Sequence, residues 1–242
     1  MIRLNAVTRS DLRRRLGGGR ALTMVTAYLS VLALLAFLSL PPDLGRLDDL
    51  RQEGLLLAFL IVETVLAAYL TSASACGEIA VEGEKSVVDL AASPFTPGAV
   101  ARGKVLTSLL FATLLTVLAV PFSLVVAGIR GEAPSAVARA AIVTVPVAAS
   151  LGALGTLYSA VFDSEFTRSF VHWLTLLALI VGATALPPPW DVLSPVRMVI
   201  LLARDGLRMD ALLASALYAL SIVPVGVAIA RRMERIRAMY QH

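Results

Sequence analysis

The sequence predicts an all-α membrane protein, and two observations predict it: the overall composition and the placement of the charges. Of the 242 residues, 58% are hydrophobic and 16% are charged, whereas soluble domains are about 45–50% apolar. The charges are also segregated, so that long stretches of the chain are almost free of them. Six such runs occur, at 21–45, 54–77 (which contains Glu63), 105–129, 140–162, 169–190 and 211–230.

Each run is long enough to span a bilayer, since roughly 20 helical residues cross about 30 Å of hydrocarbon. Helices are expected because lipid offers no hydrogen-bond partner to backbone groups. We therefore expect six transmembrane helices in a single domain that covers residues 1–242. Six spans place both termini on one side of the membrane.

The distribution of basic residues predicts the orientation. Of the 21 Lys and Arg residues, 14 lie in the N-terminus, the 77–104 and 163–168 loops and the C-terminus, and 7 lie in the other three loops. The positive-inside rule then places both termini in the cytoplasm of a multi-pass protein of the cell membrane. The net charge of +4 fits anionic lipid headgroups as partners and does not indicate nucleic acid.

The N-terminal segment 1–19 is expected to lie along the inner leaflet. Residues 2–16 mix apolar positions with Arg3, Arg9 and three consecutive arginines at 13–15, a pattern that suits an interfacial helix. The three glycines at 17–19 then allow a bend into the first span. The apolar run that follows is longer than the h-region of a signal peptide, so we expect it to remain as a span.

The polar segment 77–104 lies between the second and third runs and is predicted to dock a partner protein. Its carboxylates precede Ser93-Pro94, where the residue before proline is disfavoured in a helix, so a short amphipathic helix should end there. Thr96-Pro97 then suits a new helix start. Two helices joined at a sharp angle would form a rigid knob at the membrane face. The candidate contact residues are Glu78, Glu82, Glu84, Lys85, Asp89, Ser93, Pro94, Gly103 and Lys104.

The run from residue 84 to residue 104 resembles the cytoplasmic loop of ABC-2 type transporter permeases. The family pattern is roughly Glu-Arg-Gly-Thr-Leu-Asp-Leu-Leu, a few residues, Ser/Thr-Pro, a spacer and Gly-Lys. Ser86-Val87 replaces the family's Gly-Thr. The positions that match are Glu84-Lys85, Asp89-Leu90, Ser93-Pro94 and Gly103-Lys104.

The resemblance implies the permease subunit of an ATP-binding-cassette exporter. In that family two permease subunits, alike or different, form the pathway, and separate ATPase subunits bind ATP and magnesium. The loop between spans two and three sits in a groove of the ATPase, so that closure of the ATPase moves the spans. By this resemblance the 77–104 segment is the coupling loop, and the N-terminal interfacial helix is a second contact.

The chain itself is not expected to be an enzyme or to bind a cofactor. Residues 98–105 fit a phosphate-binding loop except at the last position, where Val105 replaces the Ser or Thr that would hold magnesium. The sequence has no hydrolase, zinc-protease or metal-spaced Cys/His motif. We therefore expect no nucleotide site, no catalytic residue and no metal site in this chain.

Glu63 is the candidate pathway residue, because a carboxylate at membrane depth should face protein or water rather than lipid. It could line a substrate path, contact another helix, or be reached by outer water or a loop arginine. An alternative function, an ion-coupled secondary transporter, would use Glu63 as its proton or cation site. A second alternative is a membrane scaffold without transport activity.

Other features of the spans have structural interpretations. Prolines 121, 146 and 224 are expected to kink their spans. Small residues recur every four positions from Ala148 to Ala160, a stripe that suits close packing within the subunit or a dimer contact. His172 is expected to form a hydrogen bond or face headgroups, and Cys76 to be a small apolar residue at a helix end.

The segment 187–210 is expected to form short helices on the outer side. Pro187-Pro188-Pro189 ends the fifth run, and the apolar stretch 192–203 is too short to span. It suits a re-entrant or interfacial segment. ABC-2 permeases carry such small outer helices before their last span, which is a second point of resemblance.

Overall fold

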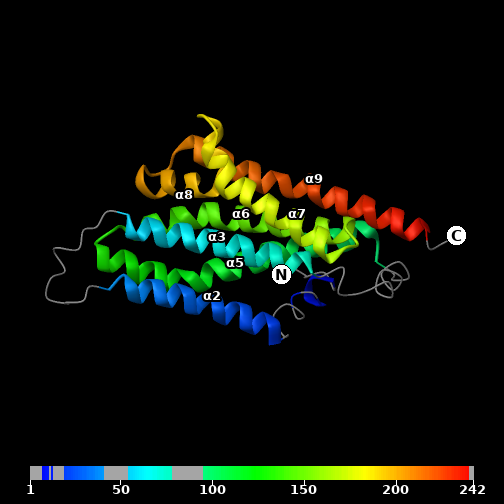
Figure 1. The fold of residues 1–242 in the computed structure, drawn as a ribbon, viewed down its shortest axis with the longest axis horizontal. Coiled ribbons are helices and arrows are strands. Elements are labelled where there is room, and N and C mark those ends of the chain that lie inside the picture. Colours follow the sequence, from blue (N-terminus) through cyan, green and yellow to red (C-terminus); the bar gives the residue numbers. More distant parts are fainter. Residues whose placement is uncertain (1–6, 11, 13–18, 41–53, 78–94, 240–242) are drawn as a thin grey trace, which may run out of the picture.

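The computed structural model describes residues 7–10, 12, 19–40, 54–77 and 95–239, and this part of the chain is helical without strands. Long helices lie side by side and successive ones run in opposite directions (Figure 1). The α-helices are α2 (Gly19–Leu38), α3 (Leu55–Cys76), α5 (Pro97–Arg130), α6 (Pro134–Val161), α7 (Glu165–Leu177), α8 (Pro195–Arg204) and α9 (Met209–Met239). The all-α prediction is therefore confirmed for the described residues.

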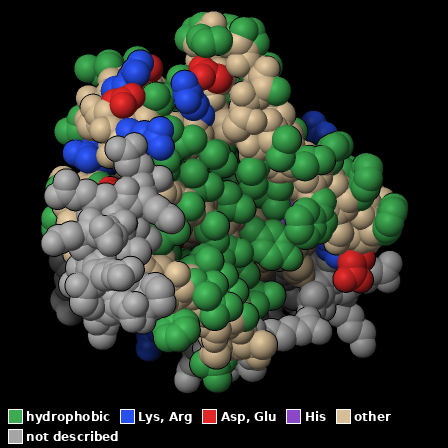
Figure 2. Space-filling model, turned by 60° about the vertical axis from the view of Figure 1, so that its left-hand side comes forward, with side chains coloured by type: hydrophobic (Ala, Val, Ile, Leu, Met, Phe, Trp, Pro, Cys, Tyr) green, Lys and Arg blue, Asp and Glu red, His purple; other side chains and the backbone are tan. Residues whose placement is uncertain are grey.

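The described residues include five helices long and apolar enough to cross a membrane. Four are α3, α5, α6 and α9, and the fifth is the continuous helical stretch Glu165–Ala185. The apolar part of α2 is shorter and covers Leu22–Leu38. Figure 2 shows hydrophobic side chains over the centre of one face, with charged side chains toward its edges. The protein is therefore a multi-pass membrane protein.

Several helices extend beyond the apolar runs that predicted them. α5 begins at Pro97 instead of 105, because Thr96 caps it and a proline at the first position loses no intrahelical bond. α6 also begins at a proline, Pro134, although Ala133 before it offers no side-chain cap. α9 continues to Met239, since Arg, Glu and Met are good helix formers in water as well as in lipid.

The fifth apolar run differs most from its prediction of 169–190. Its helix begins earlier, at Glu165, where the Ser164 hydroxyl oxygen accepts a hydrogen bond from the backbone N–H of Thr167. The α-helix then changes to a π-helix at Ala178–Gly182 and a 3-10 helix at Ala183–Ala185. This change of helix type was not predicted, because kinks were expected only at prolines and residues 178–185 contain none.

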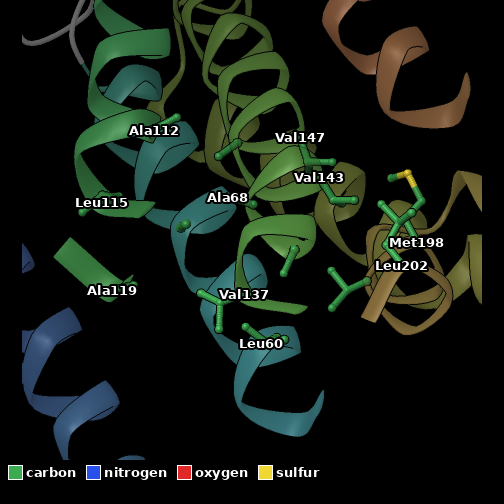
Figure 3. Packing of buried hydrophobic residues seen from close by; sticks show 14 of the residues in the cluster. Leu60, Ala68, Ala112, Leu115, Ala119, Val137, Val143, Val147, Met198 and Leu202 are labelled. Carbon is green, nitrogen blue, oxygen red and sulfur yellow. The ribbon is translucent and has the colours of Figure 1, made fainter. Parts of the chain in front are cut away.

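α6 is the centre of the bundle, and most of its span is buried against α3, α5, α8 and α9. Figure 3 shows the core between these helices. The labelled core residues are Leu60 and Ala68 of α3, Ala112, Leu115 and Ala119 of α5, Val137, Val143 and Val147 of α6, and Met198 and Leu202 of α8.

The small-residue stripe of α6 packs inside the subunit. A Cβ atom at Gly152 would lie 2.7 Å from Cγ2 of Thr71 on α3 and 2.9 Å from Cβ of Ser108 on α5. A Cβ atom at Gly155 would lie 2.5 Å from the backbone oxygen of Ser72. Of the two interpretations of this stripe, the structure supports close packing within the subunit, because α3 and α5 already occupy the space.

The segment before the last helix forms short helices that pack on the bundle. The 3-10 helix Trp190–Leu193 and α8 follow each other, and Met198 and Leu202 of α8 are fully buried. The Tyr218 hydroxyl of α9 donates a hydrogen bond to the Leu193 carbonyl oxygen at 2.7 Å. The expected short helices before α9 are therefore present, and their placement on the outer side stays a prediction.

Candidate functional site

The predicted docking segment falls largely outside the described residues. Glu78, Glu82, Glu84, Lys85, Asp89, Ser93 and Pro94 all lie there. Of the candidate contact residues, the structure places Gly103 and Lys104, both in the first turns of α5. Lys104 is 3% exposed, so it belongs to the helix packing at this end of the bundle.

The start of α5 is fixed by its cap. The Thr96 side-chain oxygen accepts a hydrogen bond from the Ala99 N–H at 3.3 Å, and Pro97 occupies the first helical position. This confirms the prediction that the chain enters a helix at Thr96-Pro97. Residues 98–105 are consequently helical, and a helix does not offer the loop of backbone N–H groups that cradles a phosphate.

The N-terminal segment contacts the same turns of α5. Residues 7–10 are helical, and the Thr8 hydroxyl donates a hydrogen bond to the Gly103 carbonyl oxygen at 3.4 Å. A Cβ atom at Gly103 would lie 2.7 Å from Cγ1 of Val7. Gly103 is thus the point at which residues 7 and 8 approach the α5 backbone closely. The rest of the expected interfacial helix is outside the described residues.

Three helices meet at this end of the bundle. Val100 of α5, Ala160 of α6 and Met233 of α9 form a small apolar cluster. Nε of Arg232 donates a hydrogen bond to the Ala160 carbonyl oxygen at 3.2 Å. The first turns of α5 therefore pack against the ends of α6 and α9.

Glu63 is a contact between helices within the chain. It is 4% exposed, and its Oε2 accepts a hydrogen bond from the Ser123 hydroxyl of α5 at 2.7 Å. The next residue, Thr64, is hydrogen-bonded to Thr144 of α6 through their hydroxyls at 2.7 Å. The sequence did not single out Ser123 as a partner, since α3 and α5 come together only in the fold. A pathway role for Glu63 stays a prediction.

A second polar cluster lies between the end of α3 and the start of α7. Ser72 and Cys76 of α3 face His172 and Arg168 of α7, with 3.5 Å between Ser72 Oγ and His172 Nε2. The thiol of Cys76 donates to the Arg168 carbonyl oxygen at 3.9 Å. Sequence analysis missed this cluster, although the spacing of four residues within each pair predicts one shared helix face.

The described residues contain no group of three or more His, Cys, Asp or Glu side chains that could hold a metal ion. No protein-family model matches the sequence, and no curated protein matches it. The described residues therefore offer buried hydrogen bonds between helices and one packed end of the bundle, where the N-terminal segment meets α5.

Proposed function

We propose that this chain is the permease subunit of an ABC-2 type exporter, with α2 as the first of six spans. The supporting layout is the alternating order of α2, α3, α5, α6, α7 and α9 (Figure 1), with short helices before the last span. Two such subunits, alike or different, would form the pathway, and a separate ATPase would hydrolyse ATP with magnesium. Both termini would lie in the cytoplasm of a cell-membrane protein.

The observation that carries this proposal is the packing at the start of α5. The segment 78–94, which bears the first part of the family-like motif, precedes the Thr96 cap in the chain. The first turns of α5 contact the N-terminal residues at Gly103 and the ends of α6 and α9 through Val100. Force applied to the segment 78–94 would reach several spans at once, as a coupling loop requires.

Charge reversal tests the proposal. The double variant Glu84→Lys/Asp89→Lys should no longer bind the ATPase subunit. ATP hydrolysis coupled to export should be lost with it. The control is Glu132→Lys, which reverses one acidic charge just beyond the opposite end of α5. If the double variant exports normally and keeps its ATPase, the proposal is wrong.

A further inference from the structure

Arg168 lies in the first turn of α7 and is 5% exposed. Its Nη1 is buried without a hydrogen-bond partner. Among the described residues, the acidic groups that form ion pairs are Asp191, Asp205 and Asp210, and they pair with other arginines. A guanidinium is always charged, and burying it without an anion is strongly unfavourable. Within the part of the chain that the structure describes, Arg168 therefore carries a buried positive charge with no acidic partner.

The other polar side chains of this cluster form hydrogen bonds that do not involve the Arg168 guanidinium. The Ser72 hydroxyl bonds the Ala68 carbonyl oxygen at 2.7 Å, and the Cys76 thiol points to the Arg168 backbone oxygen. His172 is buried one turn from Arg168 on the same side of α7 and contacts Ser72. Ser72, Cys76 and His172 thus belong to the same polar cluster as Arg168, which supplies its positive charge.

The surroundings indicate which anion is available. Tyr69 and Trp173 pack together, with ring centroids 5.2 Å apart, and Trp173 is 58% exposed beside the cluster. The rings of Phe166 and Phe170 are stacked and also exposed. Exposed aromatic residues at the end of a spanning helix lie at the level of the lipid headgroups. The anion common at that depth is phosphate.

We propose that the ends of α3 and α7 form a binding site for one phosphate group, with Arg168 as its main ligand and His172 beside it. The planar guanidinium can donate two parallel hydrogen bonds to phosphate oxygens, a geometry that an ammonium group lacks. The phosphate can belong to an anionic lipid headgroup or to free phosphate. This proposal is independent of any ATPase partner.

The test uses the full chain in a maltoside detergent, which carries no phosphate. Thermal unfolding is followed while phosphatidylglycerol, inorganic phosphate or a diacylglycerol with the same acyl chains is added. Phosphatidylglycerol should raise the unfolding temperature more than diacylglycerol does, and native mass spectrometry should show one retained lipid. A rise with inorganic phosphate as well would assign the site to free phosphate too.

Variants separate this site from general lipid binding. Arg168→Met should weaken phosphatidylglycerol binding by about tenfold, the loss expected for one charge-assisted contact. Arg168→Lys, which keeps the charge, should bind with intermediate affinity. It also provides a test if the Met variant does not fold. Arg231→Met, at an exposed position near the same end, should bind like the unmodified chain. The proposal is overturned if diacylglycerol acts as well as phosphatidylglycerol, or if Arg168→Met and Arg168→Lys both keep full affinity.

Discussion

Ser123 of α5 donates a hydrogen bond to the carboxyl group of Glu63 on α3 across 2.7 Å, and both side chains are buried. The bond joins positions 60 residues apart. A buried carboxyl group without a partner is costly at membrane depth. The pair therefore holds α3 against α5, the helix that begins at Thr96-Pro97.

Ser123→Ala should lower the free energy of unfolding by about 1–2 kcal/mol, because it leaves the Glu63 carboxyl group without its described partner. Glu63→Gln should cost less, since an amide oxygen can accept the same hydrogen bond. Ser30→Ala, at an exposed position on α2, is the control and should change stability little. Reversible unfolding in mixed micelles measures all three. Equal stability of Ser123→Ala and Ser30→Ala would contradict the assignment.

Gly155→Ala should destabilise the bundle by about 1–3 kcal/mol through overpacking. Its added methyl group would lie 2.5 Å from the Ser72 carbonyl oxygen, which belongs to helix backbone and cannot rotate away. The control is Gly226→Ala on α9, where the nearest atom is a Val105 methyl group at 3.6 Å. Because alanine favours the helix by about 1 kcal/mol, that variant should be neutral or more stable. Thermal unfolding distinguishes the two variants, and matching melting temperatures would refute close packing at Gly155.

The bounds of the helices were predictable where hydropathy decides them. α3 covers Leu55–Cys76, close to the apolar run 54–77. The start of α5 at Pro97 was predictable from the Thr96 cap and the proline that follows it. The extension of α9 past Arg231 was not predicted from hydropathy, because a helix can continue into water where no run of apolar residues marks it.

Contacts between distant helices were beyond the reach of the sequence. The sequence singles out Glu63 as a carboxylate within an apolar run. Nothing in the sequence distinguishes its partner Ser123 from the other hydroxyl residues. Arg168 looked like an ordinary loop charge and is buried only because α7 begins at Glu165. Which faces of two helices meet depends on the packing of the whole bundle.

Thr96→Ala should weaken the start of α5 and cost about 1 kcal/mol, the usual effect of losing a side-chain N-cap. Thr113→Ala on the exposed side of the same helix is the control, since its hydroxyl bonds only the carbonyl oxygen of Leu109. Amide hydrogen exchange should show faster exchange at residues 98–100 in Thr96→Ala alone. Unchanged exchange at residues 98–100 would show that the Thr96 cap does not stabilise the start of α5.

The proposed orientation predicts which positions face outward. In a chain with Cys76 replaced by serine, a cysteine at Glu132 or Leu207 should react with a membrane-impermeant maleimide on intact cells. A cysteine at Arg235 should react only after the cells are permeabilised, because α9 ends on the opposite side of the bundle (Figure 1). Labelling at residue 235 from outside would reverse the proposed topology.

The most direct measurement is a photo-crosslink from position 84 in native membranes. A photoreactive amino acid at Glu84 should capture a separate protein that mass spectrometry identifies as an ATP-binding-cassette ATPase, and the same group at Trp190 should not. The account is contradicted if position 84 crosslinks only to lipid or to this chain itself while the protein remains active.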